Sequence, residues 1–264
     1  MHLVVCVKEI MDPEIAPADF HLDIDRMRVV EDNIPRVLSP FDENALELAL
    51  QVKDRLADTR ITVISLGSSD VRETLRKCLA CGADEAVWIK VDFENGRYPD
   101  ATRTASLLAE VIREQPSFDL VLCGRQAGDW DAGQVGFILA ELLGIPCVSV
   151  VSDLKRTQQS WEFTREAGEI IQRIECAQPC LVSVTNSESN QLRLPKVRDV
   201  MRAGKKPLRV VEVSRETWAR IAPRTEVLRL DQPQQQKQCY FIEGETGEEL
   251  ARNLAEFLFD RNLV

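Results

Sequence analysis

The chain contains little histidine and few aromatic residues, which limits the chemistry it can perform. Only two of its 264 residues are histidine, and Phe, Trp and Tyr together make up 6%. Cys78 and Cys81 have the spacing of metal ligands, but no second CxxC pair is present, and only His2 and His21 are available to complete a shell. We therefore expect the eight cysteines to be buried thiols. We assign no metal site and no catalytic side chain.

Long apolar runs and an excess of positive charge are also missing. The best apolar run, residues 137–151, is interrupted by Glu141 and Pro146 and is shorter than the roughly 20 residues that span a bilayer. Charge appears at Lys8, too early for a signal peptide, so we expect a cytoplasmic protein with no membrane span. The 43 acidic residues outnumber the 33 basic ones, so nucleic acid is not an expected partner.

Strand and helix patterns alternate through the first 150 residues. The strands are expected at 3–7, 61–66, 86–89, 119–123 and 147–151, and the helices at 40–56, 71–80, 104–113 and 134–143. This order predicts an α/β fold, Rossmann-like, in which a mainly parallel sheet has helices on both faces. Shorter strands at 161–165, 169–175 and 180–185 predict a small antiparallel addition.

The chain becomes polar after residue 214. We expect one domain over 1–214, followed over 215–264 by a linker and a C-terminal helical arm. The clearest linker is the glutamine-rich stretch 232–238, and the last helix is expected at 248–259. This helix carries Leu250, Leu254, Phe257 and Leu258 on one face, so it needs another surface to cover it.

The most informative stretch runs from Gly124 to Gly136, between a buried strand and a helix. The carboxyl edge of a parallel sheet is where such proteins bind ligands, and a helix start offers free N–H groups to a phosphate. Glycines at 124, 128 and 133 let the backbone approach a ligand. Asp129 and Asp131 would repel a phosphate, and Asp131 with Gln134 has the spacing of a capping box. Neither GxGxxG nor GxxxxGK[ST] is present, so glycine spacing alone leaves nucleotide binding open.

Six segments in the same order resemble the electron transfer flavoprotein β-subunit family. They are residues 5–10 (VCVKEI), 39–47 (SPFDENALE), 81–86 (CGADEA), 122–127 (LCGRQA), 129–136 (DWDAGQVG) and 202–207 (RAGKKP). The resemblance implies an electron carrier without catalytic side chains of its own. It also implies an α subunit that shares or holds an FAD, and an arm that packs on that subunit.

The resemblance implies an adenine nucleotide, FAD or AMP, bound by this chain. The implied contacts are Cys6, Ser39, Pro40, Phe41, Asp42, Leu66, Gly124, Arg125, Gln126, Ala127, Gly128, Asp129, Asp131, Ala132, Gly133, Gln134 and Val135. Many members have Asn-Gln-Thr where this chain has 133–135 (GQV), which removes one hydroxyl donor for a monophosphate. This form looks more like electron-bifurcating members, whose β subunit holds a second FAD. The choice between AMP and FAD stays open.

Residues 186–206 are similar to the family's recognition loop, which docks on flavin dehydrogenases such as the acyl-CoA dehydrogenase type. The resemblance places the apolar anchor at Val197, with Arg193 and Arg198 beside it. Basic residues around the anchor favour an acidic partner. The alternative class is an adenine nucleotide-binding module or an adenylate-handling enzyme of similar fold. That reading needs a basic or hydroxyl-rich phosphate loop, whereas this loop offers Arg125 and two carboxylates.

Overall fold

The computed structural model describes residues 1–31, 34–68, 71–91, 99–158, 160–232 and 239–263, in two compact units. The first unit is Met1–Leu230 and the second is Asp231–Val264. This division lies further along the chain than the boundary predicted at residue 214. The reason is that α6 (Arg215–Arg220) packs the half-buried Trp218 against the core of the first unit, and Arg103 donates to the carbonyl oxygen of Ile221.

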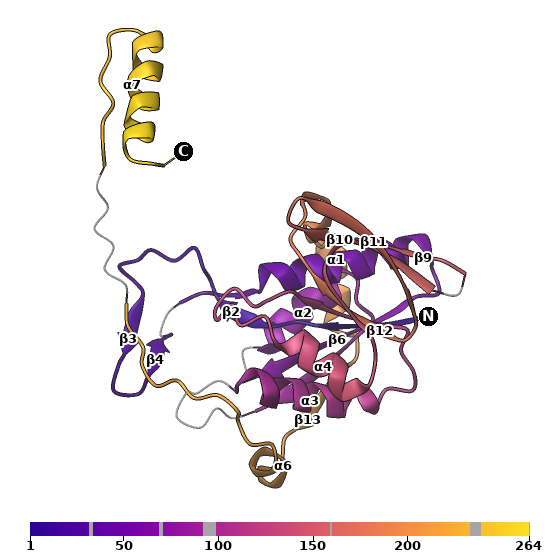
Figure 1. Cartoon of the computed structure of the whole chain (residues 1–264). Coiled ribbons are helices and arrows are strands. Elements are labelled where there is room, and N and C mark those ends of the chain that lie inside the picture. Colours follow the sequence, from indigo (N-terminus) through magenta and orange to yellow (C-terminus); the bar gives the residue numbers. More distant parts are fainter. Residues whose placement is uncertain (32–33, 69–70, 92–98, 159, 233–238, 264) are drawn as a thin grey trace. The chain divides into compact units, whose positions relative to one another are not determined.

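A nine-stranded sheet organises the first unit (Figure 1). Its order is β11 (Ile170–Ala177), β10 (Ser160–Ala167), β9 (Cys147–Arg156), β12 (Cys180–Val184), β8 (Leu120–Gly124), β1 (His2–Cys6), β6 (Arg60–Gly67), β7 (Glu85–Lys90) and β13 (Leu208–Glu212). The strands from β9 through β12 to β13 pair in parallel, and β10 pairs antiparallel with both β9 and β11. The predicted α/β class is confirmed.

One predicted strand has a different partner from the one expected. Residues 180–184 form β12, which is not part of the antiparallel addition but lies in parallel between β8 and β9. All five of its residues are buried. A short, continuously buried run is typical of a central strand in a parallel sheet, and the strand's length alone did not show this.

Helices cover both faces of the sheet. The helices α1 (Pro40–Arg55) and α2 (Val71–Cys81) pack on the face that contains Leu3 and Val5, with α5 (Val197–Ala203) beside α2. The other face, with Val4 and Cys6, carries α3 (Ala101–Arg113) and α4 (Val135–Leu143). Figure 1 shows these two helical layers. Side chains alternate between the two faces of a strand, and both faces are covered here, so residues 3–6 of β1 are all apolar.

The strand order reverses at β1. From β1 the chain passes through α1 to β6 on one side, whereas β8 lies on the other side of β1. The carboxyl ends of β1 and β8 therefore form a topological switch point, with the chain leaving in opposite directions. We call the residues around these two ends, 6–8, 39–42 and 124–136, the switch-point site.

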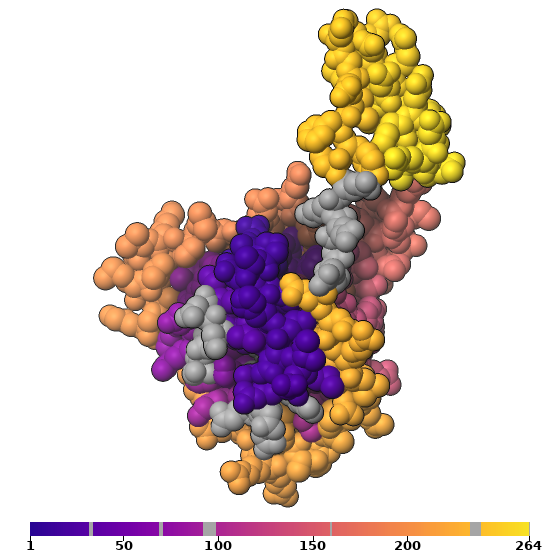
Figure 2. All heavy atoms as spheres, turned by 90° about the vertical axis from the view of Figure 1, so that its left-hand side faces the viewer, coloured from indigo at the N-terminus to yellow at the C-terminus, as the bar shows by residue number. Residues whose placement is uncertain are grey.

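Short strands lie beyond the end of β1. β2 (Glu9–Met11) pairs with β5 (Arg36–Leu38), and β3 (His21–Asp23) pairs with β4 (Arg28–Val30). Figure 2 faces the side of the molecule on which β1 ends, and these N-terminal residues occupy the centre of that view in indigo. Ile10 of β2 lies against Gly128 of the switch-point site.

The second unit contains α7 (Gly247–Asp260). Thr246 caps the helix by accepting the N–H of Glu249, and Tyr240 contacts Phe257 at a ring-centroid distance of 5.2 Å. None of the residues of α7 is buried within the described chain, and Phe259 is 67% exposed. Of the apolar face predicted for this helix, Leu250 and Leu254 are exposed, whereas Phe257 and Leu258 are half-buried.

The cysteines are free, as expected, but not all of them are buried. Five are buried, Cys147 and Cys176 are half-buried, and Cys239 is exposed. The expectation of burial is wrong for Cys239 because it lies in the second unit, which has no core of its own. Across the described residues, no group of His, Cys, Asp and Glu side chains forms a metal site. No helix among them has both the length and the apolar character needed to cross a membrane.

Candidate functional site

The carboxylate of Asp42 joins the three elements that meet at the switch-point site. One oxygen accepts the backbone N–H of Gly124 at 2.8 Å, and the other accepts that of Lys8 at 2.9 Å. The backbone N–H of Ser39 in turn donates to the carbonyl oxygen of Lys8 at 2.9 Å. The start of α1 is therefore bonded to the ends of both β1 and β8. Asp42, predicted to contact the nucleotide, has both carboxylate oxygens engaged within the chain.

Burial raises the pKa of two side chains of the switch-point site, Asp42 and Cys6. Burial raises the pKa of Asp42 to about 7, against the opposing effect of the two backbone N–H donors. Burial and the neighbouring Asp42 raise the pKa of the Cys6 thiol to about 12. Cys6 is therefore a neutral thiol that packs below the site, and it is not a nucleophile.

The glycines of the loop have different structural roles. A Cβ on Gly124 would lie 2.6 Å from the Asp42 carboxylate and 2.7 Å from the Cβ of Phe41. Gly124 is therefore required for the close approach of α1 to β8, and the approach of its backbone to a ligand stays a prediction. Gly128 lies against Ile10, because a Cβ on Gly128 would be 3.0 Å from the Cδ1 of Ile10. Gly133 has a φ of +61°, a conformation that favours glycine.

Two buried polar atoms at this site have no hydrogen-bond partner within the described chain. They are the hydroxyl oxygen of Ser39 and the Nε of Arg125. The guanidinium of Arg125 lies over the ring of Phe41, with 4.7 Å from Cζ to the ring centroid. Buried polar groups are normally bonded, so these two atoms are candidates to bind a ligand. Ser39 is the N-cap residue of α1, but its hydroxyl forms no capping bond.

The two loop carboxylates are occupied by other side chains. Asp129 forms an ion pair of 2.6 Å with Lys8 and also accepts the N–H of Trp130. Asp131 accepts a hydrogen bond of 2.8 Å from the amide of Gln126. Their engagement reduces the repulsion that they would exert on a phosphate.

The predicted capping box of Asp131 and Gln134 is wrong. The helix α4 begins at Val135, its N-cap is Gln134, and no side chain caps it. Asp131 has a φ of +49° and its N–H bonds the carbonyl of Ala127, so its backbone belongs to a turn before the helix. Because no side chain caps α4, the N–H groups of its first turn, from Val135 onward, stay available to a ligand.

The remaining predicted contacts lie near the carboxyl end of β6, at the start of α1 or in the loop before α4. Leu66 is half-buried near the end of β6, and Ala127 and Ala132 belong to the loop before α4. Pro40 occupies the first helical position of α1. Lys8 was not predicted as a site residue. The sequence does contain an indication of this role. Lys8 directly follows a buried strand, so it brings a positive charge to the carboxyl edge of the sheet.

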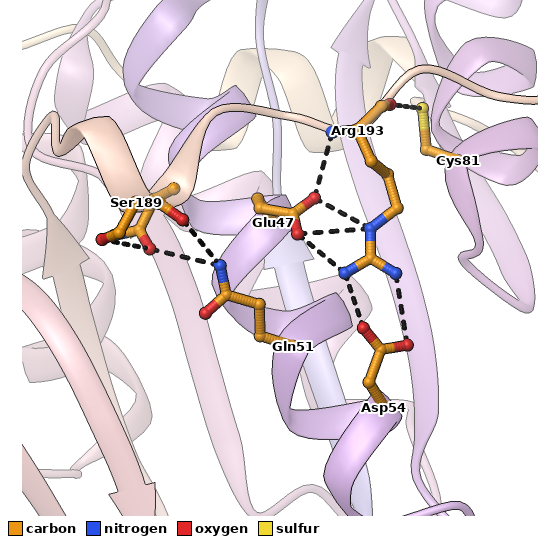
Figure 3. A network of polar contacts seen from close by, with 7 residues as sticks. Glu47, Gln51, Asp54, Cys81, Ser189 and Arg193 are labelled. Carbon is orange, nitrogen blue, oxygen red and sulfur yellow. Dashed lines mark hydrogen bonds and ion pairs between the residues drawn. The ribbon is translucent and has the colours of Figure 1, made fainter.

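The predicted docking residues lie on a different surface. Val197 begins α5 and is 80% exposed, and Leu194 and Met201 beside it are 90% and 75% exposed. We call these three side chains the apolar ridge. Arg198 is also exposed. Arg193 is bound within the chain, because its guanidinium contacts Glu47 and Asp54 of α1, each at 2.7 Å (Figure 3). Sequence reasoning missed Leu194 and Met201, although both adjoin the basic stretch.

The protein is a doubly wound α/β protein, because helices cover both faces of its mainly parallel sheet and the strand order reverses at a switch point. The chain belongs to the electron transfer flavoprotein β-subunit family. A family model, the electron transfer flavoprotein domain, matches residues 26–216. Subunit CarD of the caffeyl-CoA reductase–Etf complex of Acetobacterium woodii is 32% identical over the whole of both chains. The electron transfer flavoprotein β subunit of Megasphaera elsdenii is 33% identical over 79% of this chain and 77% of that protein. The Bacillus subtilis β subunit is 32% identical, over 81% and 79%.

Proposed function

We propose that this chain is the nucleotide-binding β subunit of a heterodimeric electron transfer flavoprotein. In this proposal an adenine nucleotide, FAD or AMP, occupies the switch-point site. The observation that carries the proposal is the pair of buried, unpartnered atoms there, the Ser39 hydroxyl and the Arg125 Nε. Members of the matched family are flavoproteins, and the relatives named above as β subunits support a partner subunit.

The residues at the site fit a phosphorylated ligand. Arg125 supplies a positive charge and an unused donor, and Ser39 supplies a hydroxyl. The first turn of α4 supplies backbone N–H groups with the favourable end of the helix dipole. Asp129 is neutralised by Lys8. Gly133 keeps the backbone at the loop's end free of a side chain, so a phosphate group can approach it closely.

In this function the flavin supplies the redox chemistry when bound, and the protein binds and orients it. The residues of this chain hold the nucleotide and contribute one side of the interface with an α subunit, which shares or holds an FAD. Electrons then pass between flavin dehydrogenases and an acceptor in the cytoplasm. No side chain of the chain transfers a proton or forms a covalent intermediate in this scheme.

The number of bound nucleotides decides between the two forms of the proposal. Copurification with the product of the neighbouring gene, followed by a visible spectrum and chromatography of released nucleotides, gives this number. Two FAD per heterodimer support the electron-bifurcating form, and one FAD with one AMP supports the simple carrier. Flavin absorption that depends on the second chain supports the electron-bifurcating form and the simple carrier alike. Adenine nucleotide without any flavin would instead identify an adenylate-handling protein.

We assign the apolar ridge as the surface that docks on flavin dehydrogenases such as the acyl-CoA dehydrogenase type. Val197 is its predicted anchor, and Leu194 and Met201 extend it. Exposed basic side chains surround the ridge, at Lys196, Arg198, Arg202 and Lys205. An acidic partner would therefore be steered toward the ridge, which would then enter an apolar pocket.

A further inference from the structure

Leu194, the first residue of the ridge, lies in a segment without secondary structure of its own, whereas Val197 and Met201 belong to α5. Between the 3-10 helix η2 (Glu188–Asn190) and the start of α5 at Val197, residues 191–196 belong to no helix or strand. Such a segment has no backbone ladder to hold its shape, so its position depends on side-chain anchors. The structure provides anchors at both ends of it.

The first anchor is a polar stripe along α1. Its members are spaced three or four residues apart, so they lie on one face of the helix: Asn44, Glu47, Gln51 and Asp54. Asn44 accepts the N–H of Ser187 at 2.9 Å, and Gln51 donates to the carbonyl of Ser189 at 2.9 Å. Every member of the stripe therefore bonds to the segment 187–193, and Figure 3 shows the part from Glu47 to Asp54.

Arg193 makes the densest contacts of this anchor. Its backbone N–H donates to Glu47 at 3.1 Å, and its guanidinium donates to the same carboxylate at 2.7 Å. It also donates to Asp54 at 2.7 and 3.2 Å. The side chain of Glu47 is only 7% exposed, so the carboxylate of this pair is shielded from solvent, whereas the side chain of Arg193 is 35% exposed. Hydrogen bonds to the two carboxylates raise the pKa of Arg193, and the Arg193 guanidinium lowers the pKa of Asp54.

The second anchor holds the far end of the segment on α2. Arg76 donates to the carbonyl oxygens of Ala203 at 2.7 Å and Lys206 at 2.9 Å. The ammonium of Lys206 donates back to Leu79 at 2.8 Å and Ala83 at 2.6 Å. The ridge therefore lies between two anchored ends, 187–193 on α1 and 203–206 on α2.

We propose that Arg193 is a positioning residue, which holds the apolar ridge in the shape that an acidic flavin dehydrogenase recognises. Leu194 follows Arg193 directly, so the clamp on Glu47 and Asp54 sets where the ridge begins. Arg193 was predicted to touch the partner, but its guanidinium is committed to α1, so its effect on docking passes through the backbone. The proposal rests on the docking assignment above. Its physical basis is that a preordered segment loses less conformational entropy on binding.

The test uses the heterodimer, with an acyl-CoA dehydrogenase and its acyl-CoA substrate as the electron donor. Arg193→Gln should raise the KM for the flavoprotein about tenfold with kcat unchanged. Trypsin cleavage after Lys196 and Arg198 should become faster in the same variant. Arg220→Gln removes an exposed arginine that pairs with Glu110, away from the segment, and should change neither quantity.

Asp54→Asn separates positioning from simple charge steering. It removes one acceptor of the clamp and also a negative charge, so steering of an acidic partner would lower the KM, whereas positioning raises it. Asp54 is 59% exposed on α1, so this variant should fold even if Arg193→Gln does not. An unchanged or lowered KM in Asp54→Asn, or equal cleavage rates in Arg193→Gln and Arg220→Gln, would overturn the proposal.

A further variant distinguishes failure of the clamp from failure of the docking assignment. Leu194→Asp should raise the KM strongly, because it puts a charge on the ridge itself. If Leu194→Asp raises the KM but Arg193→Gln does not, the positioning role is refuted and the docking surface stands. If neither variant changes the KM, the docking surface lies elsewhere and both assignments are overturned.

Discussion

The carboxylate of Asp42 and the backbone N–H of Gly124 form a hydrogen bond of 2.8 Å. The first turn of α1 is therefore bonded directly to the end of β8, across the point where the strand order reverses. This contact leaves no room for a side chain on Gly124 and removes Asp42 from solvent. Both residues belong to motifs that resemble a nucleotide site, yet their contacts here are with the protein itself.

Gly124→Ala should destabilise the first unit. The new Cβ would lie within 2.6–2.8 Å of Asp42 and of the Phe41 backbone, so α1 must shift away from β8. We expect the free energy of unfolding to fall by about 1–3 kcal/mol, measured by urea denaturation. Gly204→Ala is a control, since Gly204 has a φ of −57° and a Cβ there would meet only the carbonyl oxygen of Met201, at an ordinary 3.6 Å. An effect no larger than that of the control would show that α1 is not held by this contact.

Asp42 should make stability depend on pH. Its folded-state pKa is raised from 3.8 to about 7, so between these values the folded state binds more protons than the unfolded state. Its contribution is therefore fully present below about pH 4 and is lost as the pH rises through about 7, with a total of roughly 4 kcal/mol. Denaturation of the wild type and of Asp42→Asn at pH 5, 6, 7 and 8 measures this.

The Asp42→Asn variant should lack that part of the pH dependence. Its amide nitrogen would face one of the two backbone N–H donors, so one hydrogen bond is also lost, at a cost of about 1–3 kcal/mol. If the variant and the wild type lose stability in parallel from pH 5 to 8, Asp42 is ionised throughout this range and its pKa is not raised by burial.

Gly133→Ala should release the nucleotide bound by this chain, while FAD held by the α subunit is retained. The φ of +61° strains any side chain there, and a Cβ would meet the carbonyl of Arg125 at 3.3 Å. Gly168→Ala is a matched control with a φ of +63° and no neighbour within 4 Å, in the turn between β10 and β11. Both variants should lose about 1–2 kcal/mol of stability. Equal nucleotide contents in the two heterodimers would place the nucleotide away from this loop.

Val197→Asp should slow electron transfer with a flavin dehydrogenase without changing nucleotide content. The side chain is 80% exposed, so the substitution should leave stability within about 0.5 kcal/mol. Stopped-flow reduction of the heterodimer by an acyl-CoA dehydrogenase measures the effect. Val227→Asp, also at an exposed apolar position, is the control. Identical rates for the two variants would reduce Val197 to an ordinary surface residue.

Removal of residues 231–264 should weaken the heterodimer but leave the sheet folded. These residues form their own compact unit, and α7 has no buried residue in the described chain. The exposed Leu250, Leu254 and Phe259 are suited to a surface on the α subunit. Analytical ultracentrifugation of full-length and truncated heterodimers measures the dissociation constant. Equal constants would show that the arm does not pack on the partner.

The amino-acid sequence determined the fold class and the location of the candidate site. Apolar strands alternating with amphipathic helices leave few arrangements other than a doubly wound sheet, because each face of a parallel sheet must be covered. The segment from Gly124 to Val135 follows a strand and precedes a helix, so it must lie at the carboxyl edge. These conclusions depend on local order along the chain, which the sequence contains directly.

Only the tertiary structure decided what the individual side chains contact. Asp42 bonds Gly124 across 82 positions, and Arg193 bonds Glu47 across 146. The capping box at Asp131 failed because a turn at Ala127 delays the start of α4 to Val135. The parallel placement of β12 depended on burial on both faces rather than on strand length. Contacts between distant residues follow from how the elements pack, and a pattern within one segment does not specify them.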